Sequence, residues 1–308
     1  MGRSERDVVG FGDDVSAIKL PNSRLAVLKT DMLVGSTDIP NGMTLEQAAR
    51  KAVVANVSDL AAKGVRPYAG LVALGLPATL SEHNVRQIAD GLSSAAREYE
   101  FPLLGGDTGE SKDLVISICL LGLVNARKII LRSGAKIGDV VAVTGNFGSA
   151  AAGLRAVLDH KIRAERLPSD LGKALYHPNA QLETGIRLAS SGAITASIDS
   201  SDGLASSLYQ LGKMSGVGVR VTNVPVSRGA REFAARYGYN ALDLALYGGE
   251  EYHLIVTVKP DLFSAARKAA GGRLKRIGLV TRRAEGIRLS KNGKEALIQM
   301  KGWEHFRS

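Results

Sequence analysis

The sequence predicts an α+β fold of two domains, in which helices cover sheets. Strand-like apolar runs alternate with capped, helix-like stretches along the 308 residues, and a basic, turn-rich segment divides this alternation into two series. The dividing segment is NARKIILRSGAKIGD, residues 125–139. We therefore place a domain boundary near residue 131 and expect one domain at 1–131 and another at 132–308.

The first series contains three predicted strands and two predicted helices. The strands are expected at 25–34, 67–77 and 113–124. The helix at 44–64 has Thr44 as its N-cap, Gln47 at the capping-box position and Gly64 as its stop. A second helix starts at Ser81 and reaches residue 100. This order of elements indicates a sheet covered by two helices.

The second series continues in the same manner. Helices are expected around 148–159 and 180–191 and after Asp202. The predicted strands are DVVAVTG (139–145), AITASID (193–199), VGVRVT (217–222) and HLIVTV (253–258).

Composition and charge narrow the class of protein. The net charge of +10 favours either nucleic-acid binding or a basic surface that handles anionic substrates. Basic residues are spread out and do not alternate with aromatic ones, so we expect no nucleic-acid partner. Cys119 is the only cysteine, which excludes an intrachain disulfide and favours a reducing cytosol. With no bilayer-length apolar stretch and no signal pattern in 1–20, we expect a cytoplasmic protein without a membrane partner.

Several familiar catalytic motifs are absent from the sequence. There is no P-loop, no protein-kinase His-Arg-Asp with Asp-Phe-Gly, and no G-x-S-x-G elbow. Without C-x-x-C or His-x-x-x-His, a zinc site has no support. The stretch TGNFGSAAAG (144–153) favours a strand-to-helix turn rather than a phosphate cradle.

Acidic residues recur beside glycines and apolar runs, where an unpaired carboxylate is costly. Local explanations exist: Asp59 could pair with Lys63, Asp202 could cap a helix, and Asp13 with Asp14 could form a turn. FPLLGGDTGES (101–111) likewise has the composition of an Asp-Gly turn. The recurrence of this setting favours hard oxygen ligands for Mg²⁺, which usually shares its shell with substrate phosphates.

Eight short blocks in order resemble one family. They are GDD (12–14), TDMLV (30–34), VANVSDLAAKGVRP (54–67), LLGGDT (103–108), RSGAKIGD (132–139), DSSDGL (199–204), YGGEEYHL (247–254) and GWEHF (302–306). Their order and spacing are similar to those of thiamine-monophosphate kinases. That family belongs to the superfamily of aminoimidazole ribonucleotide synthetase, selenophosphate synthetase and the hydrogenase-maturation carbamoyl dehydratase.

The resemblance implies an N-terminal mixed sheet with helices that dimerises and binds ATP, followed by a C-terminal α/β sandwich. It implies transfer of a phosphate from ATP to thiamine monophosphate, giving thiamine diphosphate, by direct in-line attack assisted by several Mg²⁺ ions. The partners implied are ATP as co-substrate, thiamine monophosphate and a second copy of the chain.

The resemblance also assigns site residues. The implied metal ligands are Asp14, Thr30 through its carbonyl, Asp31, Asp59, Asp107, Asp199 and Asp202, of which Asp59, Asp107 and Asp202 are the catalytic candidates. The implied ATP contacts are Gly106, Asp107, Arg132 and Ser201, with Gly105 and Gly106 allowing close approach of the nucleotide. The implied thiamine-phosphate contacts are Asp38, Glu250 and Trp303.

Some residues depart from the family pattern. Lys29 stands where the family usually has Ser, and Asp38 where bacterial members usually have His. On a strand Lys29 shares a face with Asp31, so its ammonium either replaces one Mg²⁺ or extends to solvent from a frayed end.

The departures leave other functions open: a kinase of another phosphomonoester, a selenophosphate-synthetase or hydrogenase-maturation type of enzyme, or a nucleotide- or RNA-binding module without turnover. The ending WEHFRS lacks the C-terminal cysteine that the hydrogenase-maturation type carries.

Overall fold

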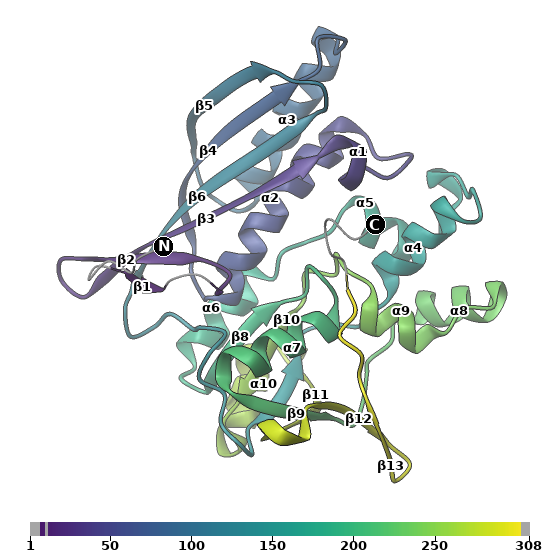
Figure 1. The fold of residues 1–308 in the computed structure, drawn as a ribbon. Helices are drawn as coiled ribbons and strands as arrows, with labels where there is room; N and C mark the ends of the chain where they lie inside the picture. Colours follow the sequence, from purple (N-terminus) through teal and green to yellow (C-terminus); the bar gives the residue numbers. More distant parts are fainter. Residues whose placement is uncertain (1–6, 10–11, 303–308) are drawn as a thin grey trace.

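Two sheets and their helices form the fold, which confirms the α+β prediction (Figure 1). The structure is a computed structural model that describes residues 7–9 and 12–302. The first sheet has six strands in the order β1-β2-β3-β6-β4-β5. Its strands are β1 (Asp7–Val9), β2 (Ser16–Leu20), β3 (Arg24–Val34), β4 (Pro67–Leu76), β5 (Leu103–Glu110) and β6 (Val115–Asn125). The sheet is mixed, because β4 and β5 run parallel while the other pairs run antiparallel.

Two long helices follow the caps that the sequence predicts. Helix α2 (Leu45–Ala62) begins after Thr44, whose hydroxyl accepts from the Gln47 amide while the Gln47 side chain accepts from the Thr44 amide. Gly64 ends it with a left-handed φ of 68°. Helix α3 (Glu82–Glu98) begins after its N-cap Ser81, and the short α1 (Gly35–Asp38) follows β3.

Helix α2 lies between the two halves of the molecule (Figure 1). It packs against β3 and β6 of the first sheet and against β8 and β10 of the second. This position explains why most of its residues are buried, including the polar Asn56, Ser58 and Asp59. Polar groups on a buried helix must find partners across its neighbours, so α2 is suited to carry site residues.

The stretch 101–111 is where the sequence prediction of a turn is wrong. Residues Leu103–Glu110 form the edge strand β5, parallel to β4. Gly106 is required there by its own sheet, because a Cβ at that position would overlap the carbonyl oxygen of Val72. Pairing with β4 outweighs the local turn preference of Asp and Gly.

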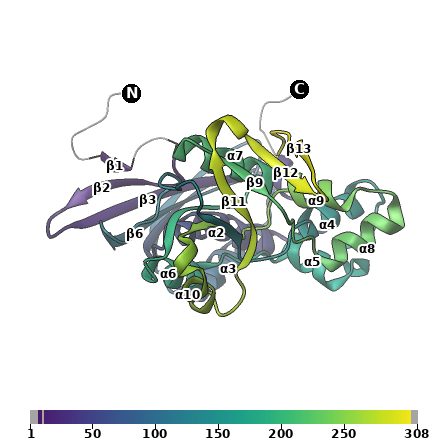
Figure 2. The same ribbon diagram turned by 90° about the horizontal axis from the view of Figure 1, so that it is seen from below.

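The second sheet has seven strands in the order β13-β12-β9-β11-β7-β10-β8 (Figures 1 and 2). They are β7 (Val140–Val143), β8 (Ile194–Asp199), β9 (Val217–Val221), β10 (Leu254–Val258), β11 (Lys275–Arg282), β12 (Ile287–Lys291) and β13 (Lys294–Leu297). The chain changes sheets between Asn125 and Val140; the exact boundary at residue 131 stays a prediction.

The helices of this half are α4 (Ser149–Leu158), α5 (Ser169–Tyr176), α6 (Leu182–Ser190), α7 (Leu204–Ser215), α8 (Arg228–Tyr237), α9 (Ala241–Tyr247) and α10 (Phe263–Ala269). Helix α7 packs on the sheet, α6 packs against α2 and α10, and α4, α5, α8 and α9 pack together at one side (Figures 1 and 2). Short 3₁₀ turns lie at Ala164–Arg166, Pro260–Leu262 and Arg283–Glu285. Strands β7, β8, β9 and β10 and helices α4, α6 and α7 confirm the elements predicted for the second series. Within the described residues, none of the helices combines the length and apolar character needed to cross a bilayer.

The face of the first sheet that points away from α2 and α3 is apolar. On β3 the side chains alternate, with Leu33 buried on the helix side while Leu28 and Met32 are exposed. Exposed apolar side chains on this sheet are Ile18, Leu20, Leu28, Met32, Tyr68, Leu71 and Leu104. A run of this kind across four strands is typical of a surface that binds a partner.

Candidate functional site

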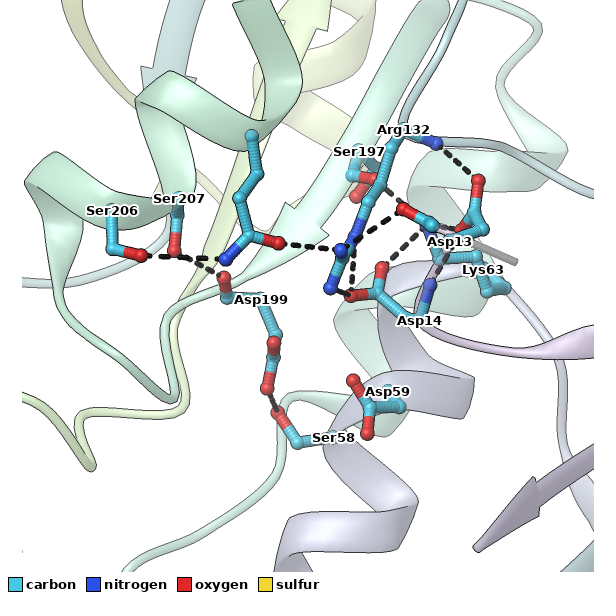
Figure 3. A network of polar contacts seen from close by, with 12 residues as sticks. Asp13, Asp14, Ser58, Asp59, Lys63, Arg132, Ser197, Asp199, Ser206 and Ser207 are labelled. Carbon is cyan, nitrogen blue, oxygen red and sulfur yellow. Dashed lines mark hydrogen bonds and ion pairs between the residues drawn. The ribbon is translucent and has the colours of Figure 1, made fainter. Parts of the chain in front are cut away.

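Three buried aspartates from separate segments meet beside α2 (Figure 3). Asp14 lies just before β2, Asp59 in the C-terminal half of α2, and Asp199 at the end of β8. One carboxylate oxygen from each lies within 4.8 Å of the others. The three residues are 5%, 6% and 2% exposed. The structure therefore buries three of the predicted metal ligands and brings them together. We call Asp14, Asp59 and Asp199 the triad.

Crowding perturbs two members of the triad. Burial and the neighbouring charge of Asp199 raise the pKa of Asp59 well above its ordinary value. Burial and the charge of Asp14 raise the pKa of Asp199 to about 7, although the Ser58 hydroxyl donates to Asp199 at 2.6 Å. Buried carboxylates this close disfavour joint ionisation, and a hard divalent cation relieves the repulsion. The donor set and spacing therefore fit Mg²⁺.

Asp14 is held ionised by two basic side chains. Lys63 Nζ lies 2.6 Å from Asp14 Oδ2 and 2.6 Å from Asp13 Oδ1, and it donates to the Ser197 carbonyl at 2.9 Å (Figure 3). The Arg132 Nε donates to Asp14 Oδ1 at 2.8 Å. Burial alone would raise the pKa of Asp14, but the charges of Lys63 and Arg132 lower it below its ordinary value. The suggested pairing of Lys63 with Asp59 is wrong.

Arg132, predicted to contact ATP, is fixed at the edge of the triad. Its backbone N–H donates to Asp13 at 2.9 Å, and its guanidinium also donates to the Gly12 carbonyl at 3.1 Å and to Gln210. These bonds join the segment before β2 to α7. The side chain is 17% exposed, and all three guanidinium nitrogens donate hydrogen bonds within the protein.

Lys29 pairs with Asp59 of the triad and with one further acid, Asp31, on β3. Its Nζ lies 2.6 Å from Asp59 Oδ2 and 3.0 Å from Asp31 Oδ1. The Lys29 side chain is only 14% exposed, which makes the suggestion of a frayed end wrong. Thr30 is exposed on the opposite face, as the strand alternation predicts. The Asp31 amide donates to Asn56 Oδ1 at 3.0 Å and ties β3 to α2.

Gly106 and Asp107 do not join the triad within the described chain. Across the intervening β6 and β4, the strand register aligns Gly106 with Asp31. Three strand spacings separate these two residues by roughly 14 Å. The same register aligns Asp107, which is exposed, with the exposed Met32. At that separation one ion cannot bind both Asp31 and Asp107 of a single chain.

The loop after β8 faces the segment before β10. The Ser201 carbonyl accepts from the Glu250 amide at 2.6 Å. The N-cap of α7 is Gly203, so the helix-cap explanation of Asp202 is wrong. Glu250 has a left-handed φ of 62°, a conformation costing about 1–3 kcal/mol that is often found at functional sites.

Two predicted substrate contacts meet at Lys51 on α2. Its ammonium forms an ion pair with Glu250 and donates to the Asp38 carbonyl at 2.9 Å. The Asp38 carboxylate itself accepts from the Val34 amide at 2.8 Å and is directed to its own helix α1. The third predicted contact, Trp303, lies outside the described residues. No sequence pattern marked Lys51, because its partners come from distant segments.

A pocket of about 460 Å³ lies beside Glu250, between α5 and the start of α4. Its lining includes Ser149, Asp170, Arg228, Glu250 and His253. The start of α4 is occupied by Glu251, which accepts from the amides of Gly148 at 2.6 Å and Ala150 at 3.1 Å. An internal carboxylate thus takes the place that an anion would occupy, which agrees with the turn interpretation of 144–153.

Comparisons with known proteins show which proteins the chain is similar to. Residues 12–124 match the family "AIR synthase related protein, N-terminal domain". The chain is 37% identical over 298 residues to the thiamine-monophosphate kinase of Nitrosopumilus maritimus, covering 96% of this chain and 93% of that protein. It is 34% identical to the thiamine-monophosphate kinase of Pyrococcus abyssi, covering 96% and 90%. A solved structure, "AaThiL complexed with AMPPCP and TMP", aligns with a TM-score of 0.84 at 28% identity over 98% of this chain and 93% of that one.

Proposed function

The chain belongs to the thiamine-monophosphate kinase family, and on this premise we propose that it transfers the γ-phosphate of ATP to thiamine monophosphate. The observation that carries the proposal is the buried triad, which lies on a chain similar over nearly its whole length to kinases of this name. The same likeness favours this activity over the hydrogenase-maturation type.

We propose that the three carboxylates of the triad, Asp14, Asp59 and Asp199, hold Mg²⁺. When bound, Mg²⁺ neutralises phosphate charge and aligns the two phosphates for in-line attack. The chain supplies rigidity: Lys63 and Arg132 fix Asp14, and the Ser58 hydroxyl fixes Asp199. Preorganised acids bind metal without first rearranging. Thr30, Asp31 and Asp202 are proposed as further ligands around this centre.

The attacking group needs no general base from the protein. The second pKa of a phosphomonoester is about 6, so the acceptor phosphate is mostly dianionic at neutral pH. The protein must instead hold two anions, the γ-phosphate of ATP and the acceptor phosphate, next to each other. Lys29, Lys63 and Arg132 place three fixed positive charges among the acids of the site.

We propose that thiamine monophosphate binds beside Glu250, in the pocket of about 460 Å³. The carboxylates of Glu250 and Asp170 suit a cationic thiazolium ring, and Trp303 would stack on one of its rings. Asp38 contributes to this pocket indirectly, because its carbonyl accepts from Lys51, which pairs with Glu250.

We propose that ATP extends from the triad toward β5, contacting Gly106, Asp107, Arg132 and Ser201. A triphosphate carrying more than one Mg²⁺ is suited to the roughly 14 Å between Asp31 and Gly106. Asp107 is aligned with Met32, which belongs to the apolar face of the first sheet. We propose that a second copy of the chain packs on this face to form a homodimer. A cytoplasmic location stays a prediction.

The direct test is incubation with ATP, Mg²⁺ and thiamine monophosphate, with thiamine diphosphate and ADP quantified by chromatography. Equal amounts of the two products are expected. Thiamine and unrelated phosphomonoesters serve as alternative acceptors. ADP formed only with another phosphomonoester would reassign the acceptor, and nucleotide binding without any product would favour a binding module.

A further inference from the structure

The position of Lys29 in the site is fixed by strand β3. On β3 the side chains of Lys29 and Asp31 point to the face covered by α2, where Asn56 and Asp59 lie. The backbone around them is paired along its length with β6, which fixes the register. Its ammonium therefore has little freedom to leave without breaking two short ion pairs.

Each carboxylate of the triad has its own polar partner. Lys63 and Arg132 both form ion pairs with Asp14, and the Ser58 hydroxyl donates a hydrogen bond to Asp199. Among the described residues, Lys29 is the cation that pairs with Asp59. Removing one partner of a buried pair leaves an uncompensated charge, so Asp59 depends on Lys29 or on a cation that replaces it.

The Lys29 ammonium occupies the position between the carboxylates of Asp31 and Asp59. Nζ lies 2.6 Å from one carboxylate oxygen and 3.0 Å from the other, so an ion bridging the same oxygens would overlap the ammonium. Asp59 still has its second oxygen to offer to the triad. A lysine ammonium is a compact point charge that binds phosphate as well as carboxylate.

We propose that Lys29 is a permanent cation of the phosphate-transfer site, which fills the position between Asp31 and Asp59 in place of one divalent ion and stays there when nucleotide and metal bind. The inference rests on the proposed function. It assigns Lys29 a positioning role: it holds Asp59 toward the triad and lowers the number of divalent ions that the site needs.

The test counts metal ions without using activity. Mn²⁺ binding is titrated by calorimetry and electron paramagnetic resonance with a non-hydrolysable ATP analogue and no acceptor. Lys29→Ser should bind one more ion per chain than the parent, while Lys29→Arg, which keeps the charge, should match the parent. Lys19→Ser, at an exposed position on the neighbouring β2, is the matched control and should also match it. Equal numbers of bound ions in the parent and in Lys29→Ser would overturn the proposal.

A second measurement uses the unmodified chain. Lysines are labelled by reductive methylation with and without Mg²⁺ and the ATP analogue, and labelling of each is read by mass spectrometry. Lys29 should stay unlabelled in both states, while exposed Lys19 is labelled in both. Labelling of Lys29 after metal addition would show that metal displaces the ammonium, which also overturns the proposal. Because neither experiment contains thiamine monophosphate, failure to make thiamine diphosphate remains a separate result.

Discussion

Lys63 Nζ lies 2.6 Å from Asp14 Oδ2, and neither side chain is exposed. The pair joins the end of α2 to the segment before β2, and the bond from Lys63 to the Ser197 carbonyl adds β8. One ammonium thus locks together the three segments that carry the triad. Without it, Asp13 and Asp14 would face each other with Arg132 as their remaining cation.

Lys63→Met should lower the free energy of unfolding by about 3 kcal/mol, because breaking a buried pair leaves charge unpaired. Urea unfolding in metal-free buffer measures the change. Lys213→Met, at an exposed position on α7, is the control and should alter stability by less than about 0.5 kcal/mol. A Lys63 variant as stable as the control would mean that Arg132 alone neutralises the acids.

Local patterns predicted helices α2, α3, α4, α6 and α7, the N-caps of the first two, and strands β3, β4 and β6 to β10, because those signals lie within a few residues. Helices α1, α5, α8, α9 and α10 and the other strands were not predicted. Thr44, Gln47 and Gly64 act on their own helix. The i, i+2 spacing of a strand did place Lys29 beside Asp31. The pairs of Lys63 with Asp14 and of Lys29 with Asp59 depend instead on how the segment before β2 and strand β3 approach α2, and no spacing in the sequence encodes that. An i, i+4 rule therefore paired Lys63 with Asp59, whereas Asp59 pairs with Lys29.

Composition also misled at β5, where glycines and an aspartate occupy an edge strand. Its pairing with β4 is a tertiary contact that turn statistics do not contain. Aspartates beside apolar runs did indicate the triad, because burial of Asp14, Asp59 and Asp199 requires compensation.

Asp59→Asn and Asp107→Asn should each lower kcat by at least ~10²-fold while the fold survives, because each loss removes charge that holds metal against phosphate. Steady-state kinetics and circular dichroism measure the two properties. Asp90→Asn, on the exposed side of α3, should keep normal turnover. Loss in Asp59→Asn with normal turnover in Asp107→Asn would confine the metal site to the triad.

The raised pKa of Asp199 predicts how the free energy of unfolding depends on pH in metal-free buffer. Its pKa is raised from 3.8 to about 7, so its favourable contribution is complete below pH 4 and is lost as the pH rises through 7. The free energy of unfolding should therefore fall between pH 5 and pH 8. Asp199→Asn should flatten this fall, and Mg²⁺ should restore stability at pH 8 to the parent only. Parallel pH profiles for the two proteins would contradict the assigned cause.

Leu71→Glu should convert a dimer into a monomer. Leu71 is 51% exposed near the middle of the apolar sheet face, so a carboxylate there would be buried without a partner in the interface. Light scattering after size exclusion measures the mass. Leu297→Glu, 57% exposed on β13, is the matched control and should leave the mass unchanged. A parent that is already monomeric would exclude the dimer.

Trp303→Ala should weaken binding of thiamine monophosphate by roughly 1–2 kcal/mol and leave ATP affinity nearly unchanged. Trp303 lies outside the described residues, but Gly302 before it is described, and a Cβ there would overlap the carbonyl oxygen of Asp202. This contact places Gly302 at the loop after β8, whose Ser201 carbonyl accepts from the Glu250 amide. Calorimetric titration of each ligand separates the two affinities, with Tyr237→Ala on α8 as the aromatic control. Equal losses for both ligands would mean that Trp303 only packs against the loop, and a loss confined to thiamine monophosphate would support its stacking on the acceptor.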